Sequence, residues 1–168
     1  MTAPFTFEAL ASHHDRASFN CGVEALDRYL AAQAMQDQRR RIAGCYIALD
    51  AAAGQIAGFY TIAAASMPIG EVSPKLAKKL PRYPLVPCVR LGRLAVATAH
   101  RGKGLGAALS IDAIQRSLRS EIVAFAMIVD AKDKSASRFY RRHGFEAFMS
   151  APITLYLPMA EVAKRLAP

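Results

Sequence analysis

The sequence lacks the features that mark membrane-spanning, secreted and disulfide-linked proteins. No uninterrupted apolar run reaches the roughly 20 residues that a membrane-spanning helix needs, and the longest apolar stretch lies around residues 56–67. Residues 1–10 show no basic segment followed by an apolar run and a small-residue cleavage site, so we expect no secretory signal and predict a cytoplasmic location. Cys21, Cys45 and Cys88 are odd in number and widely separated, which argues against disulfides or a metal site and predicts buried structural thiols.

Carboxylates are missing from one long stretch of the chain. The sequence has 22 Lys and Arg against 13 Asp and Glu, a formal net charge of +9, which predicts an anionic partner. No Asp or Glu stands between Glu71 and Asp112. A solvated surface would show the same pattern, so the partner is a hypothesis. The basic residues in this gap are Lys75, Lys78, Lys79, Arg82, Arg90, Arg93, Arg101 and Lys103.

The order of apolar and turn-forming segments predicts one mixed α/β domain spanning residues 1–168. No internal repeat, low-complexity tract or linker interrupts it. Prolines recur in residues 68–87, which are predicted to form a structured surface loop with a short basic helix near residues 74–80. The other predicted strands are 4–10, 43–50, 55–67, 88–96, 124–131, 145–149 and 153–159, and the other predicted helices are 23–40, 104–120, 133–143 and 160–166.

A glycine-rich turn at residues 101–106 (RGKGLG) lies between a predicted strand and a predicted helix. The unpaired N–H groups of a first helical turn, together with the helix dipole, favour anion binding, and glycines allow a phosphate to approach closely. The spacing excludes the phosphate loop of nucleotide triphosphatases. A dinucleotide fingerprint through Gly102, Gly104 and Ala107 is a weaker rival, because fewer than 40 residues after Asp130 remain for the second half of such a sheet.

Arg101-x-x-Gly104-x-Gly106 resembles the Arg/Gln-x-x-Gly-x-Gly/Ala signature of the Gcn5-related N-acetyltransferase (GNAT) family. The resemblance covers essentially the whole chain and implies a central, mixed, mostly antiparallel sheet flanked by helices. It also implies that main-chain amides of the turn hold the pyrophosphate of acetyl-CoA while the preceding strand pairs with the pantetheine arm. The implied cofactor-binding residues are Leu94, Ala95, Val96, Arg101, Gly102, Lys103, Gly104, Leu105, Gly106, Ala107, Ser135 and Phe139. In this interpretation Arg101 and Lys103 add mobile positive charge beside the phosphates.

Residues 136–145 (ASRFYRRHGF) look like a second segment of the same family, Ala-x-x-Phe/Leu-Tyr-x-x-x-Gly-Phe. The resemblance assigns Tyr140 as the catalytic residue. A phenol of pKa ~10 is close enough to a thiol of pKa ~8.5 to donate a proton to a departing thiolate. Many family members carry Asn where this chain has Asp133, which is a departure from the family pattern, and Asp133 is expected to be a helix N-cap.

The predicted strand at residues 89–96 and its flanks contain no carboxylate that could act as a base. This favours an acceptor that needs no strong base. A lysine amine of pKa ~10.4 is almost fully protonated at neutral pH, whereas an α-amine near ~7.7 is partly neutral. An α-amine is therefore the predicted acceptor. Glu8, Glu24 and Asp27 remain alternative bases.

Residues 19–30 (FNCGVEALDRYL) resemble the opening of the acetyltransferase toxins of type II toxin–antitoxin systems, and Arg93-Leu94-Ala95-Val96 is similar to their central strand. The resemblance implies a toxin that blocks translation by acetylating the α-amine of aminoacyl-tRNA. It also implies a ribbon-helix-helix antitoxin as partner, with DNA bound only through the antitoxin complex. The candidate RNA contacts are Arg93, Lys75, Lys78, Lys79, Arg82, Arg39, Arg40 and Arg41.

Two other functions stay open at this point. The first is an acetyltransferase for a protein N-terminus, a polyamine or a small-molecule amine. The second is a nucleic-acid-binding protein or co-repressor without catalysis. A homodimer is expected to use an edge strand near residues 153–159. His13, His14, His100 and His143 show no partner pattern and are expected to have surface or capping roles.

Overall fold

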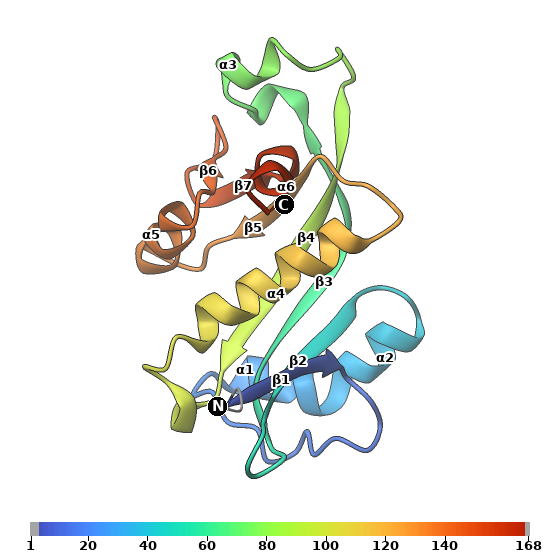
Figure 1. The fold of residues 1–168 in the computed structure, drawn as a ribbon, viewed down its shortest axis with the longest axis vertical. Coiled ribbons are helices and arrows are strands. Elements are labelled where there is room, and N and C mark those ends of the chain that lie inside the picture. The colour runs from blue at the N-terminus through green and yellow to red at the C-terminus, as the bar shows by residue number, and fades with distance from the viewer. Residues whose placement is uncertain (1–3, 167–168) are drawn as a thin grey trace. The chain divides into compact units, whose positions relative to one another are not determined.

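Within residues 4–166, which the computed structural model describes, seven strands are hydrogen-bonded in the order β1-β2-β3-β4-β5-β7-β6 (Figure 1). The pairs β1/β2, β2/β3, β5/β7 and β6/β7 are antiparallel. This confirms the predicted α/β fold with a mixed, mostly antiparallel sheet. The strands are β1 (Phe5–Ala9), β2 (Gly44–Asp50), β3 (Ile56–Pro68), β4 (Leu85–Val96), β5 (Ala126–Asp130), β6 (Glu146–Ala147) and β7 (Thr154–Pro158).

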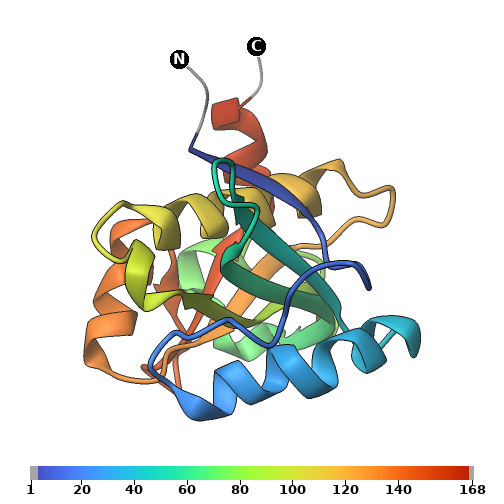
Figure 2. The ribbon, with the colours of Figure 1, turned by 90° about the horizontal axis from the view of Figure 1, so that it is seen from below.

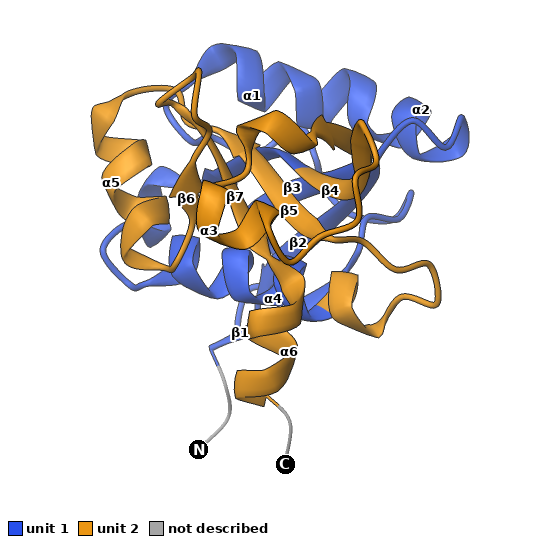
Figure 3. Ribbon diagram, turned by 90° about the horizontal axis from the view of Figure 1, so that it is seen from above, with its two compact units in different colours: residues 1–63, 91–115 blue, residues 64–90, 116–168 orange. Residues whose placement is uncertain are grey.

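The chain packs as two units, each built from two separate stretches of sequence (Figure 3). The first unit contains residues 1–63 and 91–115, and the second contains residues 64–90 and 116–168. Strands β3 and β4 run through both, so neither unit is a continuous piece of sequence. The single domain predicted for residues 1–168 stays a prediction.

In the first unit, a helical segment and helix α4 cover opposite faces of the strands (Figure 2). Leu30 and Ala34 of the segment are fully buried in a cluster with Ile47 and Phe59. On the other face Gly58 leaves room for α4, since a Cβ there would lie 2.9 Å from Leu109 Cδ1. The helical elements of this unit are α1 (Glu24–Arg28), the π-helical turn η1 (Tyr29–Gln33), α2 (Ala34–Arg39), the 3-10 turn η3 (Thr98–His100) and most of α4 (Leu105–Arg119).

In the second unit, the core forms around Tyr156 of β7, which is fully buried. Its hydroxyl accepts a hydrogen bond from the Ser73 backbone N–H at 3.0 Å and donates one to Glu146 Oε2 at 2.9 Å. The same ring therefore anchors the start of α3 and the short strand β6. The helical elements of this unit are η2 (Ile69–Glu71), α3 (Pro74–Ala77), α5 (Lys134–Arg142) and α6 (Met159–Leu166).

The structure corrects three details of the predicted order. Strand β4 begins at Leu85, so the predicted loop ends two residues before Pro87. A proline fits this strand because Pro87 is exposed and has no N–H that needs a partner, while its carbonyl accepts from the Phe125 N–H at 2.8 Å. Helix α3 covers only residues 74–77 of the predicted 74–80. Strand β7 pairs with both β5 and β6, so it is not the edge strand predicted near residues 153–159.

The three cysteines are free and buried, as predicted. Burial raises the pKa of the Cys45 thiol to about 12 and that of Cys88 to about 11. Because the thiolate is the reactive form, these cysteines are structural. Among residues 4–166, no helix combines the length and the apolar character that crossing a bilayer requires.

Candidate active site

The glycine-rich turn between β4 and α4 is an open cradle lined by main chain. Gly102 and Gly104 adopt left-handed φ angles of +78° and +75°, which disfavour any residue with a Cβ. No heavy atom lies within 4 Å of the position that a Cβ would take at either glycine. The space in front of the turn is therefore free for a ligand to approach the backbone.

Helix α4 begins directly after this turn and supplies the donors for an anion. Leu105 is buried and fixes the first turn of the helix, while Gly106 and Ala107 stay half-buried. The N–H groups of a first helical turn have no partner within the helix, and the dipole of this 15-residue helix adds positive potential there. Glycines that leave space and a helix N-terminus that supplies donors fit the pyrophosphate of acetyl-CoA.

Arg101 braces the turn instead of offering a mobile charge, so that part of the prediction is wrong. Its Nη2 donates to the carbonyl oxygen of Cys21, and the nearby Thr98 N–H donates to the Asn20 carbonyl at 2.9 Å. Gly22, at φ +85°, permits this approach, because a Cβ there would lie 3.0 Å from the guanidinium. The motif of residues 19–30 thus contacts the turn through Cys21 and Gly22.

Lys103 lies on a small polar chain beside the turn. Its Nζ is 3.3 Å from His100 Nδ1, and His100 Nε2 is 3.5 Å from Asp50 Oδ2. Hydrogen bonds from the Ala52 and Ala53 backbone N–H groups hold the pKa of the Asp50 carboxyl below its ordinary value. Together with Pro4 and Phe5, these residues line a cavity of about 330 Å³.

The end of β4 carries Arg93 beside the predicted pantetheine-pairing residues. Leu94 and Val96 are half-buried, and Ala95 is buried in the core cluster of the first unit. The Arg93 guanidinium carbon lies 3.6 Å from the centroid of the Tyr29 ring. The sequence offered one signal for Tyr29, its place in the motif of residues 19–30, but gave it no role.

Tyr140 lies in the second unit, on helix α5, with Ser135 and Phe139. Asp133 caps this helix by accepting from the Ala136 N–H at 2.8 Å, as predicted. The Tyr140 ring packs at centroid distances of 5.1 Å from Phe139 and 5.3 Å from Phe145. Burial raises the pKa of the Tyr140 phenol to about 12, so it is fully protonated at neutral pH.

The insertion between β3 and β4 presents its basic residues outward. Lys75, Lys78, Lys79 and Arg82 are all exposed, while Leu76, Ala77 and Leu80 pack on the core cluster of the second unit. The insertion is also tied down, because Glu71 accepts from the Ser150 backbone N–H at 3.1 Å and from the Ser150 hydroxyl. Tyr83, which follows Arg82 in the sequence, is 63% exposed. The sequence did not single out this aromatic residue.

A second basic surface, Arg39–Arg41, closes helix α2 in the first unit. All three side chains are exposed. The helix ends in a Schellman motif, with Ile42 N–H donating to the Asp37 carbonyl at 2.8 Å and Arg41 N–H to Gln38 at 3.2 Å. Arg41 occupies the left-handed position of this motif at φ 60°, where glycine is the usual residue.

The carboxylates considered as alternative bases make internal contacts or stay on the surface. Asp27 Oδ1 accepts the Cys21 N–H at 2.9 Å, and Glu24 is exposed. A carboxylate that the sequence did not single out, Asp130, ends β5 and contacts Arg90, and it accepts from Thr154 Oγ1 at 2.9 Å.

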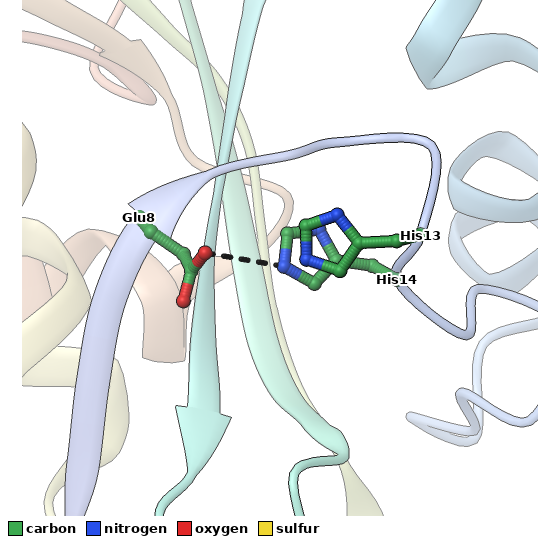
Figure 4. Close-up of side chains that lie close together, drawn as sticks. All are labelled: Glu8, His13 and His14. Carbon is green, nitrogen blue, oxygen red and sulfur yellow. Dashed lines mark ion pairs between the residues drawn. The ribbon is translucent and has the colours of Figure 1, made fainter.

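Glu8, His13 and His14 gather within ligand distance of one another (Figure 4). Of the surface and capping roles expected for the histidines, the surface role does not apply to His14, which is buried and has its Nε2 3.3 Å from Glu8 Oε2. His14 Nδ1 accepts from the Ala11 N–H at 2.9 Å, so the neutral ring carries its proton on Nε2. An Nε2 that holds a proton cannot ligate a metal, so the cluster fits an internal polar contact. His143 is a helix cap, with Nδ1 2.7 Å from the Phe139 carbonyl.

Comparison with known proteins links this chain to one family. The model of the GNAT acetyltransferase domain matches residues 41–147. A curated relative, the tRNA-acetylating toxin of Mycobacterium tuberculosis (strain ATCC 25618 / H37Rv), is 31% identical over 149 residues, which cover 88% of this chain and 87% of the relative.

Solved structures extend the similarity to the fold. AtaT complexed with acetyl-methionyl-tRNAfMet has a TM-score of 0.87 and 27% identity, covering 97% of this chain and 99% of AtaT. AtaTR bound with AcCoA has a TM-score of 0.78 and 27% identity, covering 98% and 99%. A tyrosine-to-phenylalanine mutant of AtaT bound to the C-terminus of the antitoxin AtaR has a TM-score of 0.79 and 25% identity, covering 99% and 100%.

Proposed function

The chain belongs to the GNAT family of acetyl-CoA-dependent N-acetyltransferases, and from this premise we propose that it acetylates the α-amino group of aminoacyl-tRNA as the toxin of a type II toxin–antitoxin pair. The proposal rests chiefly on one observation, an acetyltransferase whose insertion exposes four basic side chains and carries no carboxylate after Glu71. An enzyme acting on a polyamine would repel its cationic acceptor with such a surface, whereas RNA phosphates are attracted to it. The relative from Mycobacterium tuberculosis is itself named a tRNA-acetylating toxin.

The residues of the turn fit the coenzyme. Backbone N–H groups from Gly102 to Ala107 would hold its pyrophosphate, and the main chain of Leu94–Val96 would pair with pantetheine. Bound there, acetyl-CoA supplies an activated acetyl thioester. Because the binding groups belong to the backbone, they need no reorganisation as the ligand arrives.

Tyr140 is proposed to act as the general acid. Its hydroxyl forms no hydrogen bond with any other residue in the described range 4–166, so Oη is free to give its proton to the departing sulfur. Its pKa of about 12 keeps the proton in place until a strong base appears beside it. A thiolate shielded from water is such a base, because desolvation raises its pKa. The acceptor loses its own proton to water, which suits an α-amine.

The experiment that tests this function is acetyl transfer from labelled acetyl-CoA to a panel of acceptors. The panel contains aminoacyl-tRNA, the same tRNA without its amino acid, a peptide with a free N-terminus, and spermidine. We expect label only on the aminoacyl-tRNA, and expect ribonuclease treatment to remove it from the RNA fraction. Label on the peptide or on spermidine, with none on aminoacyl-tRNA, would assign the chain to another GNAT acceptor class.

The proposed partner is an antitoxin encoded beside the toxin. AtaT binds the C-terminus of its antitoxin AtaR, and we infer that a cognate antitoxin of ribbon-helix-helix type binds this chain and brings it to DNA. Expression of the chain alone is expected to stop growth of a bacterial host, and co-expression of the neighbouring short reading frame is expected to restore growth. Growth arrest that persists when Tyr140→Phe replaces the wild type would contradict a catalytic toxin.

A further inference from the structure

Arg93 differs from the other arginines near β4 in having an uncommitted guanidinium. Arg90 contacts Asp130, and Arg101 donates to the Cys21 carbonyl. The side chain of Arg93 has no hydrogen bond or carboxylate partner among the residues that the structure describes, although it is half-buried. Its five N–H donors are thus available within the guanidinium plane.

This guanidinium stacks on a ring that is itself held in place by hydrogen bonds. Its carbon lies 3.6 Å from the Tyr29 ring centroid, which leaves the in-plane donors clear. The Tyr29 hydroxyl donates to Asp37 Oδ2 at 2.8 Å, and Gln33 Nε2 donates to Asp37 Oδ1 at 2.9 Å. The backbone N–H of Arg93 donates to Thr61 Oγ1 at 3.1 Å. Tyr29 stands at the start of the π-helical turn η1, a feature that is frequent at functional sites.

Asp37 does not neutralise Arg93, although it is near enough to influence it. The hydrogen bonds from Gln33 and Tyr29 hold the pKa of the Asp37 carboxyl below its ordinary value, so it is an anion engaged by these two donors. Burial and the bond to Asp37 raise the pKa of the Tyr29 phenol, which keeps the hydroxyl as a donor. The positive charge of Arg93 remains available to an incoming anion.

The place of Arg93 on β4 puts it at the acceptor end of the proposed coenzyme site. A pyrophosphate held at residues 102–106 leaves pantetheine to run back along Leu94–Val96, so the acyl end reaches the Arg93 side of that stretch. Arg93 and Ala95 share one face of β4, the face covered by the segment that contains Tyr29. An acceptor amine that meets the acyl group therefore comes close to the guanidinium.

We propose that Arg93, positioned by Tyr29 and Asp37, binds a phosphate of the 3′-terminal nucleotides of the acceptor, and that this contact selects an amino acid attached to RNA over the same amine without phosphate. The inference rests on the proposed function. A guanidinium can meet a phosphate with two parallel N–H···O bonds, which an ammonium cannot do. Arg93 is the binding residue, and Tyr29 and Asp37 act through it.

The test compares two acceptors. One is aminoacyl-tRNA and the other is puromycin, an aminoacyl nucleoside with a free α-amine and no phosphate. The readout is the ratio of kcat/KM for the two, measured for wild type, Arg93→Gln, Arg93→Lys, Tyr29→Leu and Tyr29→Phe. We expect the ratio to fall about tenfold for Arg93→Gln, through KM for the RNA, and less for the other variants. Arg165→Gln, which removes an exposed charge on α6, is the matched control and should leave the ratio unchanged.

A second readout separates a phosphate contact from a packing role. The slope of log(kcat/KM) for aminoacyl-tRNA against log[salt] should become shallower by about 0.7 for Arg93→Gln, the contribution of one phosphate in a single strand. If the wild-type enzyme does not acetylate puromycin, the salt slope alone decides whether Arg93 binds a phosphate. Melting temperature and acetyl-CoA affinity are recorded for each variant. Should Tyr29→Leu fail to fold, Tyr29→Phe replaces it, because it keeps the ring and removes only the bond to Asp37.

An unchanged salt slope, or equal losses on both acceptors, would overturn the inference and leave the proposed function standing. A loss of acetyl-CoA affinity in Arg93→Gln would also overturn it, because the guanidinium would then serve the coenzyme. A wild-type enzyme that acetylates puromycin or other amines but never aminoacyl-tRNA would instead refute the proposed function.

Discussion

The turn at residues 101–106 and the insertion at residues 68–87 both carry positive charge, but they are built in opposite ways. The turn is proposed to bind through main chain, with two left-handed glycines and the start of α4, while its Arg101 side chain donates to the Cys21 carbonyl. The insertion packs Leu76 and Leu80 against the core cluster of its unit and presents exposed lysines. Binding at the turn should therefore depend on backbone conformation, whereas binding at the insertion should depend on charge and on salt.

Loss of the Tyr140 hydroxyl is expected to have the largest effect. Tyr140 lies in the same unit as the insertion, so the variant tests whether this unit contributes chemistry in addition to charge. Tyr140→Phe should lower kcat by about 10²- to 10⁴-fold, the usual contribution of a general acid. Acetyl-CoA affinity and the melting temperature should stay near those of wild type. A kcat within a factor of two of wild type would remove Tyr140 from the mechanism.

A methyl group in the turn is expected to have the next largest effect. Gly104→Ala places a Cβ in the cradle and costs about 1–2 kcal/mol of backbone strain. We expect acetyl-CoA affinity, measured by calorimetry, to fall on the order of tenfold or more, with little change between low and high salt.

Gly54→Ala is the matched control for the turn. Gly54 has φ +70° and open space around its Cβ position, like Gly104, but it lies in the loop between β2 and β3. It should lose similar stability and keep its acetyl-CoA affinity. Equal losses of affinity in the two variants would show that strain alone, and not the filled cradle, explains the result.

Neutralising the insertion should give smaller, additive and salt-dependent effects. Lys78→Gln is expected to lower kcat/KM for aminoacyl-tRNA about threefold at moderate salt and to make the salt slope shallower by about 0.9. Adding Lys75→Gln, Lys79→Gln and Arg82→Gln should repeat that change for each side chain that binds a phosphate in the wild type. The KM for acetyl-CoA should not respond. Lys164→Gln on α6 serves as the control for net charge.

The smallest effect on activity is expected at Arg41, which shares one feature with the turn and one with the insertion. Its left-handed backbone resembles the turn, and its exposed charge resembles the insertion. Arg41→Gly should raise the free energy of unfolding by about 1 kcal/mol, because glycine adopts this conformation without strain. Activity on aminoacyl-tRNA should fall less than threefold, as expected when a single side chain no longer binds a phosphate. Unchanged stability in urea unfolding would show that neighbouring residues absorb the strain.

The same contrast explains what could be predicted from the sequence. Glycine spacing, the succession of strands and helices along the chain and the N-cap at Asp133 can be read from local sequence, and they located the turn and helix α5 correctly. The brace from Arg101 to Cys21 and the stack of Arg93 on Tyr29 join residues 80 and 64 positions apart, and no local pattern reveals which donors are already occupied. The interior position of β7 likewise depends on pairing with the distant β5.

In the proposed reaction, the acetyl group ends on the α-nitrogen of an amino acid carried by tRNA. Its most direct test is mass spectrometry of the aminoacyl-adenosine released by ribonuclease from charged tRNA after incubation with the protein and acetyl-CoA. We expect a product heavier by one acetyl group, with fragmentation placing that group on the α-nitrogen. Unmodified aminoacyl-adenosine, recovered while coenzyme A is released by transfer to another amine, would contradict it.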